Sequence, residues 1–192
     1  MLYYLSCFFV RIFMHIVFRI KVEGRENIIS DGPIVICSNH VTAWDPLFVA
    51  ITFPQPVCYM AKAELFENKI ANWFFRSVYV FPVKRGGNDI HAIKSALSIL
   101  KQGHTLGLFP EGTRHTDGQE HEAKSGVAML AYKGGARIQP VALTGNIKPF
   151  GHVCIHIGKP ISYDHEAMGK PSNDDYKAMT KELMHVIEGL KK

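Results

Sequence analysis

The chain has 192 residues, of which 47% are hydrophobic and 20% are charged. This length suffices for one domain with a sizeable core, and the composition excludes wholesale disorder. The net charge of +5 favours anionic partners such as lipid headgroups or phosphorylated substrates, but no dense basic run or nucleic-acid-binding motif accompanies it, so we expect no nucleic-acid partner.

The first twenty residues are far more apolar than the rest, and several interpretations compete for them. A secretory signal is rejected, because the charges lie within and after the apolar run and no cleavage site follows. A transmembrane helix is disfavoured, because Arg11 near its middle costs roughly 2.5–3.5 kcal/mol on insertion. A helix packed on the protein's own core and a helix lying in a membrane interface both remain open.

The pattern over residues 2–20 fits the membrane-interface helix best. Arg11, His15 and Arg19 are spaced i, i+4, i+8, so on a helix they would form one cationic stripe. The other faces are apolar, and we expect three phenylalanines to enter the membrane: Phe8, Phe9 and Phe13. A wide apolar face with a narrow cationic stripe suits an anionic membrane surface. We assign residues 1–22 to this anchor and residues 23–192 to the domain that follows.

After the anchor, short apolar runs alternate with helical patterns. Six runs predict buried strands, at residues 34–37, 57–60, 78–83, 106–109, 138–143 and 153–157. Helices are expected from Pro46, after Asn88 as N-cap, at residues 124–132, and after Ser172 or Asn173 as the last cap. The last helix carries an apolar stripe that consists of Tyr176, Met179, Leu183, Ile187 and Leu190. The alternation predicts one layered α/β domain with a mixed, largely buried sheet flanked by helices.

A histidine and an aspartate follow the first of these strands. His40 and Asp45 are five residues apart, and Pro46 favours a new helix with Asp45 as its N-cap. We expect His40 in a loop that folds back to bring the carboxylate to the imidazole. An imidazole oriented in this way can remove a proton from a hydroxyl, so the pair predicts general-base chemistry. The alternative is an ordinary loop histidine and a helix cap.

Three further blocks place polar groups after strands. Residues 109–114 form a Pro-Gly turn that carries Glu111, Gly112, Thr113 and Arg114, and an arginine there suits a phosphomonoester. Residues 81–87 end with Lys84 and Arg85 before two glycines. Residues 61–66 add Lys62 beyond another strand. Each block alone could be a solvated turn or a surface lysine.

Taken in order, these blocks resemble the family of lysophosphatidic acid and glycerolipid acyltransferases. Residues 39–45 match its His-x4-Asp motif, residues 81–85 look like its second motif, and residues 109–114 match its third. An apolar strand with a proline at residues 138–142 looks like the fourth. Two departures keep a polar group: Thr42 and His115 stand where the family often has Ser.

The resemblance implies the glycerolipid acyltransferase fold and a direct acyl transfer to lysophosphatidic acid. It implies His40 as base and Asp45 as its orienting group, with Glu111 and Gly112 at the acceptor site. Arg85 and Arg114 become candidate phosphate ligands, with Lys62, Lys84 and Thr113 as further substrate contacts. Acyl-CoA or acyl-carrier protein would be the donor, with no metal and no other cofactor. The enzyme would then lie on the cytoplasmic face of a membrane.

Other functions remain as alternatives. The acceptor could be a different lyso-lipid, and a non-catalytic lipid-surface protein is a more distant reading. A cysteine-nucleophile enzyme is a third, because Cys37 is near His40. However, the four cysteines are widely spaced without a CxxC pair, and we expect buried free thiols and no zinc site.

Overall fold

The computed structural model describes residues 2–83, 89–112 and 125–192. A seven-stranded sheet forms the centre, in the order β1-β7-β6-β2-β5-β3-β4. Among the described strands, the β6–β7 pair alone is antiparallel, and the other neighbouring pairs are parallel. The strands are β1 (Arg19–Glu23), β2 (Ile34–Ser38), β3 (Val57–Lys62), β4 (Val80–Val83), β5 (Thr105–Leu108), β6 (Arg137–Gly145) and β7 (His152–Ile157). The predicted mixed, largely buried α/β sheet is confirmed.

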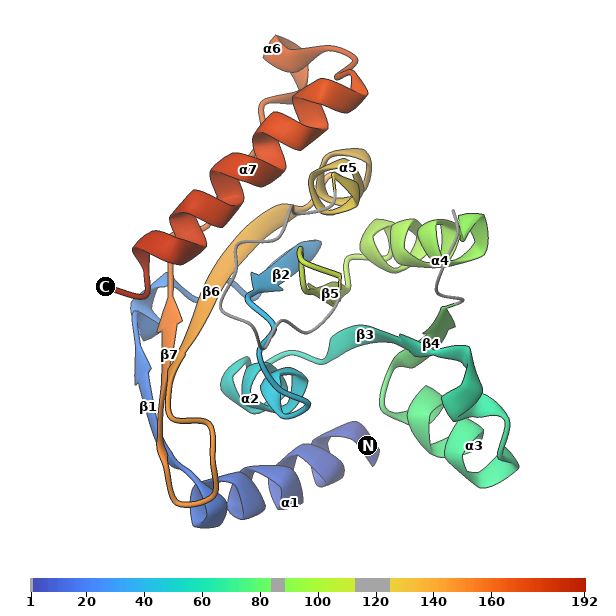
Figure 1. Cartoon of the computed structure of the whole chain (residues 1–192). Helices are drawn as coiled ribbons and strands as arrows, with labels where there is room; N and C mark the ends of the chain where they lie inside the picture. The colour runs from blue at the N-terminus through green and yellow to red at the C-terminus, as the bar shows by residue number, and fades with distance from the viewer. Residues whose placement is uncertain (1, 84–88, 113–124) are drawn as a thin grey trace.

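Helices cover both faces of the sheet (Figure 1). They are α1 (Leu2–Val17), α2 (Asp45–Thr52), α3 (Lys69–Ser77), α4 (Ile90–Lys101), α5 (Gly126–Lys133), α6 (His165–Met168) and α7 (Asn173–Gly189), with short 3-10 turns η1 (Arg25–Asn27) and η2 (Ala63–Phe66). Alternation along β2 explains the two layers, because successive side chains point to opposite faces. Ile34 and Ile36 join the core beside α1 and α2, whereas Val35 and Cys37 join the core beside α4, α5 and α7.

The N-terminal helix is shorter than predicted. It ends at Val17, and Arg19–Glu23 form strand β1, which pairs in parallel with β7. Polar and apolar residues alternate over this strand. This period of two favours a strand over a continuation of the preceding apolar helix. Met14 and Phe18 are buried in the core, so the segment is part of the folded domain rather than a detached anchor. No helix among the described residues is long and apolar enough to cross a membrane.

Other boundaries also differ from the prediction. Asp45 is the first residue of α2 rather than its N-cap, which is Trp44. Asn88 lies outside the described residues, and the side chain of Asp89 caps α4 by accepting from the Ala92 amide at 3.0 Å. Helix α5 runs from Gly126 to Lys133, and of the two residues expected to cap α7 it is Ser172 that does so.

Helix α3 was not predicted, and it shortens the next strand. Asn68 caps it, with its side-chain oxygen accepting from the Ile70 and Ala71 amides. Tyr79 then adopts a φ of 62° as the chain turns back toward the sheet. Strand β4 therefore begins at Val80 rather than at residue 78.

Candidate active site

The candidate site lies at the carboxyl ends of the neighbouring parallel strands β2 and β5. Cys37 pairs with Leu108, so the loops that follow the two strands leave the sheet side by side. Asn39 ties the first loop to β6: its side chain donates to the Leu143 carbonyl at 3.0 Å and accepts from the Leu143 amide at 2.8 Å. The backbone that carries His40 is thereby fixed to the sheet.

The structure brings His40 and Asp45 together. His40 Nδ1 lies 2.8 Å from Asp45 Oδ2, and the Asp45 side chain is fully buried. Three more donors converge on this carboxylate: the Val41 amide at 2.7 Å, the Thr42 amide at 2.8 Å and the Thr42 hydroxyl at 2.6 Å. A carboxylate surrounded by donors accepts from Nδ1–H, so the free lone pair of the neutral imidazole is on Nε2. This tautomer suits a general base.

The turn after β5 packs against one face of the His40 imidazole. Phe109 stacks on the imidazole with ring centroids 4.1 Å apart and an interplanar angle of 21°, and Tyr59 stacks on Phe109. Glu111 Oε2 accepts from the His40 amide at 3.4 Å. The Gly112 amide donates to the Phe109 carbonyl at 2.9 Å and Gly112 has a φ of 73°, which favours glycine. The first and third sequence blocks thus form one site.

The sequence patterns do not predict two contributors to the site, Phe109 and Thr42. They place Phe109 in a strand and show Thr42 only as a departure from the family motif; an aromatic residue directly before a strand-end turn is the signal that could have indicated the ring stack. Trp44, beside Asp45, has its ring centroid 6.0 Å from that of Phe13 and 5.9 Å from that of Phe18. The His40–Asp45 loop therefore contacts the N-terminal helix.

The remaining predicted substrate contacts are only partly placed. Lys62 is exposed at the carboxyl end of β3, which is the same edge of the sheet as the site because β3 pairs in parallel with β5. Four others lie outside the described residues: Lys84, Arg85, Thr113 and Arg114. The departure at His115 lies outside them too.

The predicted cationic stripe does not form. Arg11 turns toward the protein and donates to the Ile51 carbonyl at 2.6 Å, where the C-terminal end of α2 favours a cation. His15 Nδ1 lies 2.9 Å from the Arg11 carbonyl. Arg19 belongs to β1, beside His152 of β7, and shares no helix face with the other two. By contrast, the three predicted phenylalanines are exposed on α1: Phe8, Phe9 and Phe13.

The cysteines do not support nucleophilic catalysis. All four are free, as expected, but only Cys37 and Cys58 are buried, whereas Cys7 and Cys154 are partly exposed. Cys37 is buried, and this burial raises the pKa of its thiol well above the usual range, so the thiolate is scarce. Burial also raises the pKa of Cys58 to about 11. The burial of Cys37 therefore disfavours the cysteine-nucleophile alternative.

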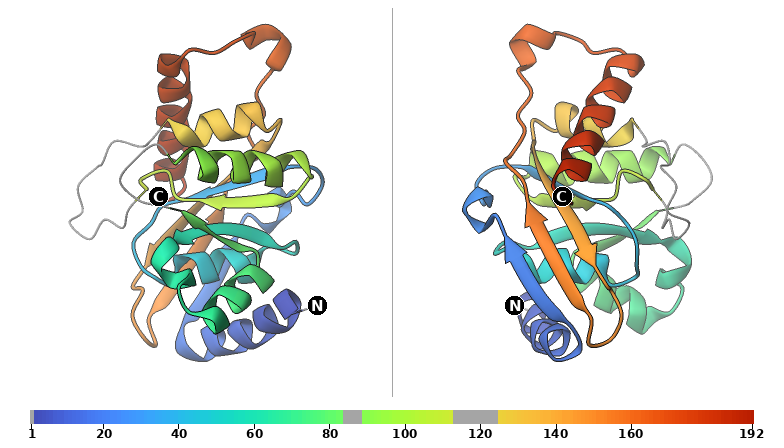
Figure 2. Two further views of the ribbon diagram at one scale, coloured as in Figure 1. Left: turned by 90° about the vertical axis from the view of Figure 1, so that its right-hand side faces the viewer. Right: turned by 60° about the vertical axis from the view of Figure 1, so that its left-hand side comes forward.

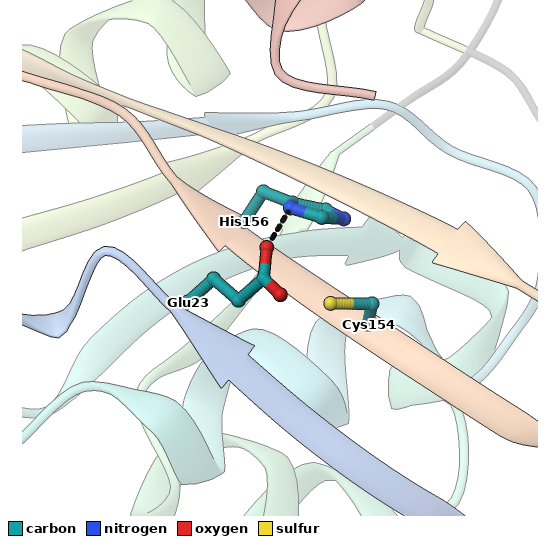
Figure 3. Close-up of side chains that lie close together, drawn as sticks. All are labelled: Glu23, Cys154 and His156. Atoms are coloured by element: carbon teal, nitrogen blue, oxygen red, sulfur yellow. Dashed lines mark ion pairs between the residues drawn. The ribbon is translucent and has the colours of Figure 1, made fainter. Parts of the chain in front are cut away.

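One cluster among the described residues has the donor set of a metal site. Glu23, Cys154 and His156, from β1 and β7, have ligand atoms within 4.8 Å of one another (Figure 3). The spacing of the cysteines along the sequence does not predict this cluster, because its three residues come from alternate positions on β7 and from the neighbouring strand. Yet Lys21 Nζ lies 2.6 Å from Glu23 Oε1, and His156 Nδ1 lies 2.9 Å from Glu23 Oε2. With the carboxylate already paired, the cluster is adequately explained as an ion-pair network between strands.

Comparisons with known proteins agree with this geometry. Residues 19–144 match the family model described as "Acyltransferase". The chain is 35% identical to a 1-acyl-sn-glycerol-3-phosphate acyltransferase of Streptococcus pneumoniae, over 68% of this chain and 51% of that protein. It is 32% identical to a protein of the same name from Bacillus subtilis, over 74% of this chain and 73% of that one.

A solved structure resembles the whole fold. The crystal structure of the 1-acyl-sn-glycerophosphate (LPA) acyltransferase PlsC from Thermotoga maritima has a TM-score of 0.71 and 27% identity, covering 94% of this chain and 76% of that one. The chain spans about half the length of the Streptococcus pneumoniae relative.

Proposed function

The chain belongs to the acyltransferase family, and from this premise we propose that it is a 1-acyl-sn-glycerol-3-phosphate O-acyltransferase. It transfers a fatty acyl group from acyl-CoA or acyl-carrier protein to the sn-2 hydroxyl of lysophosphatidic acid, and the product is phosphatidic acid. The observation that carries the proposal is the buried, four-donor Asp45 carboxylate held 2.8 Å from the imidazole of His40. The names of the relatives support the choice of acceptor.

The chemistry follows from the tautomer of His40. Nε2 takes the proton from the acceptor hydroxyl as its oxygen attacks the thioester carbonyl of the donor. The new C–O bond forms, the C–S bond breaks, and the imidazolium returns the proton to the departing thiolate. Asp45 stabilises the imidazolium between these steps. The transfer is direct, without an acyl-enzyme and without a further cofactor.

Binding of the acceptor phosphate requires cationic side chains. The sequence has them in residues 61–66, 81–87 and 109–114. We assign Arg85 and Arg114 as phosphate ligands by resemblance, with Lys84, Thr113 and Lys62 as further contacts. Arginine suits this role because its planar guanidinium pairs with two phosphate oxygens. Glu111 and Gly112 then lie where the acceptor meets His40.

The location proposed for the enzyme is the cytoplasmic face of a membrane. Its acceptor has an acyl chain in the bilayer, whereas its donor is soluble. The exposed phenylalanines of α1 support this location, because they offer apolar surface for a lipid leaflet. The contact between Trp44 and Phe13 would keep the catalytic loop next to that leaflet.

The test is a panel of lyso-lipid acceptors offered to the purified protein with each donor type. We expect transfer to lysophosphatidic acid, and a loss of roughly 10²–10⁴-fold in His40→Ala. Arg114→Ala should lower kcat/KM for lysophosphatidic acid more than for an acceptor without a phosphomonoester. Transfer only to another lyso-lipid would establish the alternative acceptor, and near-normal turnover in His40→Ala would remove the mechanism.

A further inference from the structure

Helix α3 presents a row of large apolar side chains to solvent. Ile70, Trp73 and Phe74 are 77%, 63% and 42% exposed. They are spaced i, i+3, i+4 and so share one face of the helix. The opposite side holds the helix to the protein, since the ring of Phe75 lies 5.5 Å from that of Phe66 in η2. An amphipathic helix normally buries its apolar face, but here that face points away from the core.

This surface continues into the exposed face of α1. Figure 2 places α1 and α3 at the same end of the molecule. The two are bridged by tyrosines: the rings of Tyr3 on α1 and Tyr79, which follows α3, are 5.6 Å apart. Tyr4 and Tyr79 are themselves about half exposed. Two helices that are far apart in the sequence thus offer one apolar and aromatic surface.

The basic residues of α3 indicate what kind of partner covers this surface. Lys69 and Arg76 lie seven residues apart on the helix, next to the apolar row, and both are exposed. Arg76 also donates to Asn72 within the helix at 2.8 Å. A tryptophan and a phenylalanine bordered by basic side chains match the layered chemistry of a leaflet, with acyl chains below and anionic headgroups above.

We propose that α3 is a second membrane-insertion element, which embeds Ile70, Trp73 and Phe74 in an anionic leaflet while Lys69 and Arg76 contact the headgroups. The proposal rests on the membrane location proposed above and adds a contact that α1 does not provide. Helix α3 follows the carboxyl end of β3, through η2, and this is the edge of the sheet where the candidate site lies. Insertion of both α1 and α3 would therefore fix the orientation of this edge relative to the bilayer. A single inserted helix would leave the protein free to rotate about that helix.

Tryptophan fluorescence tests insertion directly. The chain has two tryptophans, so Trp44→Phe leaves Trp73 as the only one. In the full-length protein, addition of phosphatidylcholine–phosphatidylglycerol vesicles should shift Trp73 emission to the blue, and brominated acyl chains should quench it. Continued quenching by iodide in the vesicle-bound protein would overturn the proposal.

A partition assay provides the second measurement. The triple variant Ile70→Ser, Trp73→Ser, Phe74→Ser should bind these vesicles at least roughly tenfold more weakly, because full burial of even one large apolar side chain is worth about that factor. The matched control is Ile90→Ser on α4, which is 60% exposed and should bind like the parent. Equal binding by the triple variant and the parent would overturn the proposal, provided that circular dichroism shows both folded.

Two outcomes separate this inference from the proposed function. If acyl transfer to detergent-dispersed lysophosphatidic acid occurs but Trp73 stays in water, the inference fails and the function stands. If Trp73 inserts but no acceptor is acylated, the function fails and the inference stands. A lipid-free dimer that the triple variant converts to monomers would assign the α3 face to a second copy of the chain, and would also overturn the proposal.

Discussion

At the residue scale, the candidate site depends on how His40 is held. Asp45 fixes one ring nitrogen, and Phe109 covers a face of the ring. The stack limits rotation of the imidazole about its χ2 angle, which would otherwise break the bond to Asp45. We therefore predict that Phe109 positions the imidazole of His40 and does not itself contact the reacting atoms.

Replacement of Phe109 tests this role. We expect Phe109→Leu to lower kcat roughly 2–10-fold with little change in KM, because an aromatic stack is worth about 0.5–1.5 kcal/mol. Phe109→Tyr keeps the ring and should restore the rate. The imidazole NMR signals should show a less populated Nδ1–H tautomer in the leucine variant only. A change in KM alone would contradict the positioning role.

At the element scale, α1 has both a structural and a surface-exposed side. Met14 is fully buried, whereas Phe9 is 60% exposed on the same helix. Deleting residues 1–20 would remove core side chains and part of β1, so loss of membrane binding in such a truncation would not identify an anchor. Single substitutions separate the two roles.

Met14→Ala and Phe9→Ser form a matched pair. Met14→Ala should lower the free energy of unfolding by about 2–5 kcal/mol, because it leaves a cavity in the core. Phe9→Ser should change it by less than about 0.5 kcal/mol but weaken vesicle binding. Urea unfolding and vesicle sedimentation measure the two effects. The membrane assignment of α1 would be wrong if Phe9→Ser bound vesicles as well as the parent protein.

Helix α7 offers a test of local stability. Its N-terminus carries a capping box, in which Ser172 Oγ accepts from the Asp175 amide and the Asp175 carboxylate accepts from the Ser172 amide. Ser172→Ala should cost about 1 kcal/mol of stability at neutral pH, measured by urea unfolding.

The same cap predicts a pH dependence. Hydrogen bonds from the Ser172 amide and hydroxyl lower the pKa of Asp175 in the folded chain. A carboxylate with a lowered folded pKa contributes stability above its unfolded pKa, and that contribution is lost as pH falls through the folded pKa. The difference in unfolding free energy between the parent and Ser172→Ala should therefore shrink at acidic pH. A constant difference across the titration would contradict this account.

At the scale of the whole molecule, we expect the net charge of +5 and the apolar surface of α1 and α3 to contribute together to membrane binding. Binding to anionic vesicles should fall by roughly tenfold as the ionic strength rises from about 0.1 to 1 M, because the screening length falls from about 10 to 3 Å and each basic group near the surface is worth about 1 kcal/mol. Binding to neutral phosphatidylcholine vesicles should change little. Equal salt dependence for both vesicle types would mean that charge does not contribute.

The sequence by itself determined the features that depend on short stretches of chain. Short apolar runs predicted five of the strands closely, and Ser172 was one of the two residues predicted to cap α7, because these signals need only a few neighbouring residues. The His40–Asp45 pair was predictable for the same reason, since the loop between the two is four residues long.

Tertiary structure decided the features that depend on strand order and burial. The Glu111 contact with the His40 amide joins residues 71 apart, and it exists because β2 and β5 are neighbours in the sheet. Arg19 became a strand residue because β7 offered an unpaired edge, so pairing outweighed the helical pattern. Trp73 points outward because Phe75, on the opposite side of α3, packs against Phe66 of η2. The Glu111 contact and the pairing of β1 were set by distant segments, and local sequence carries no information about which segment will lie alongside.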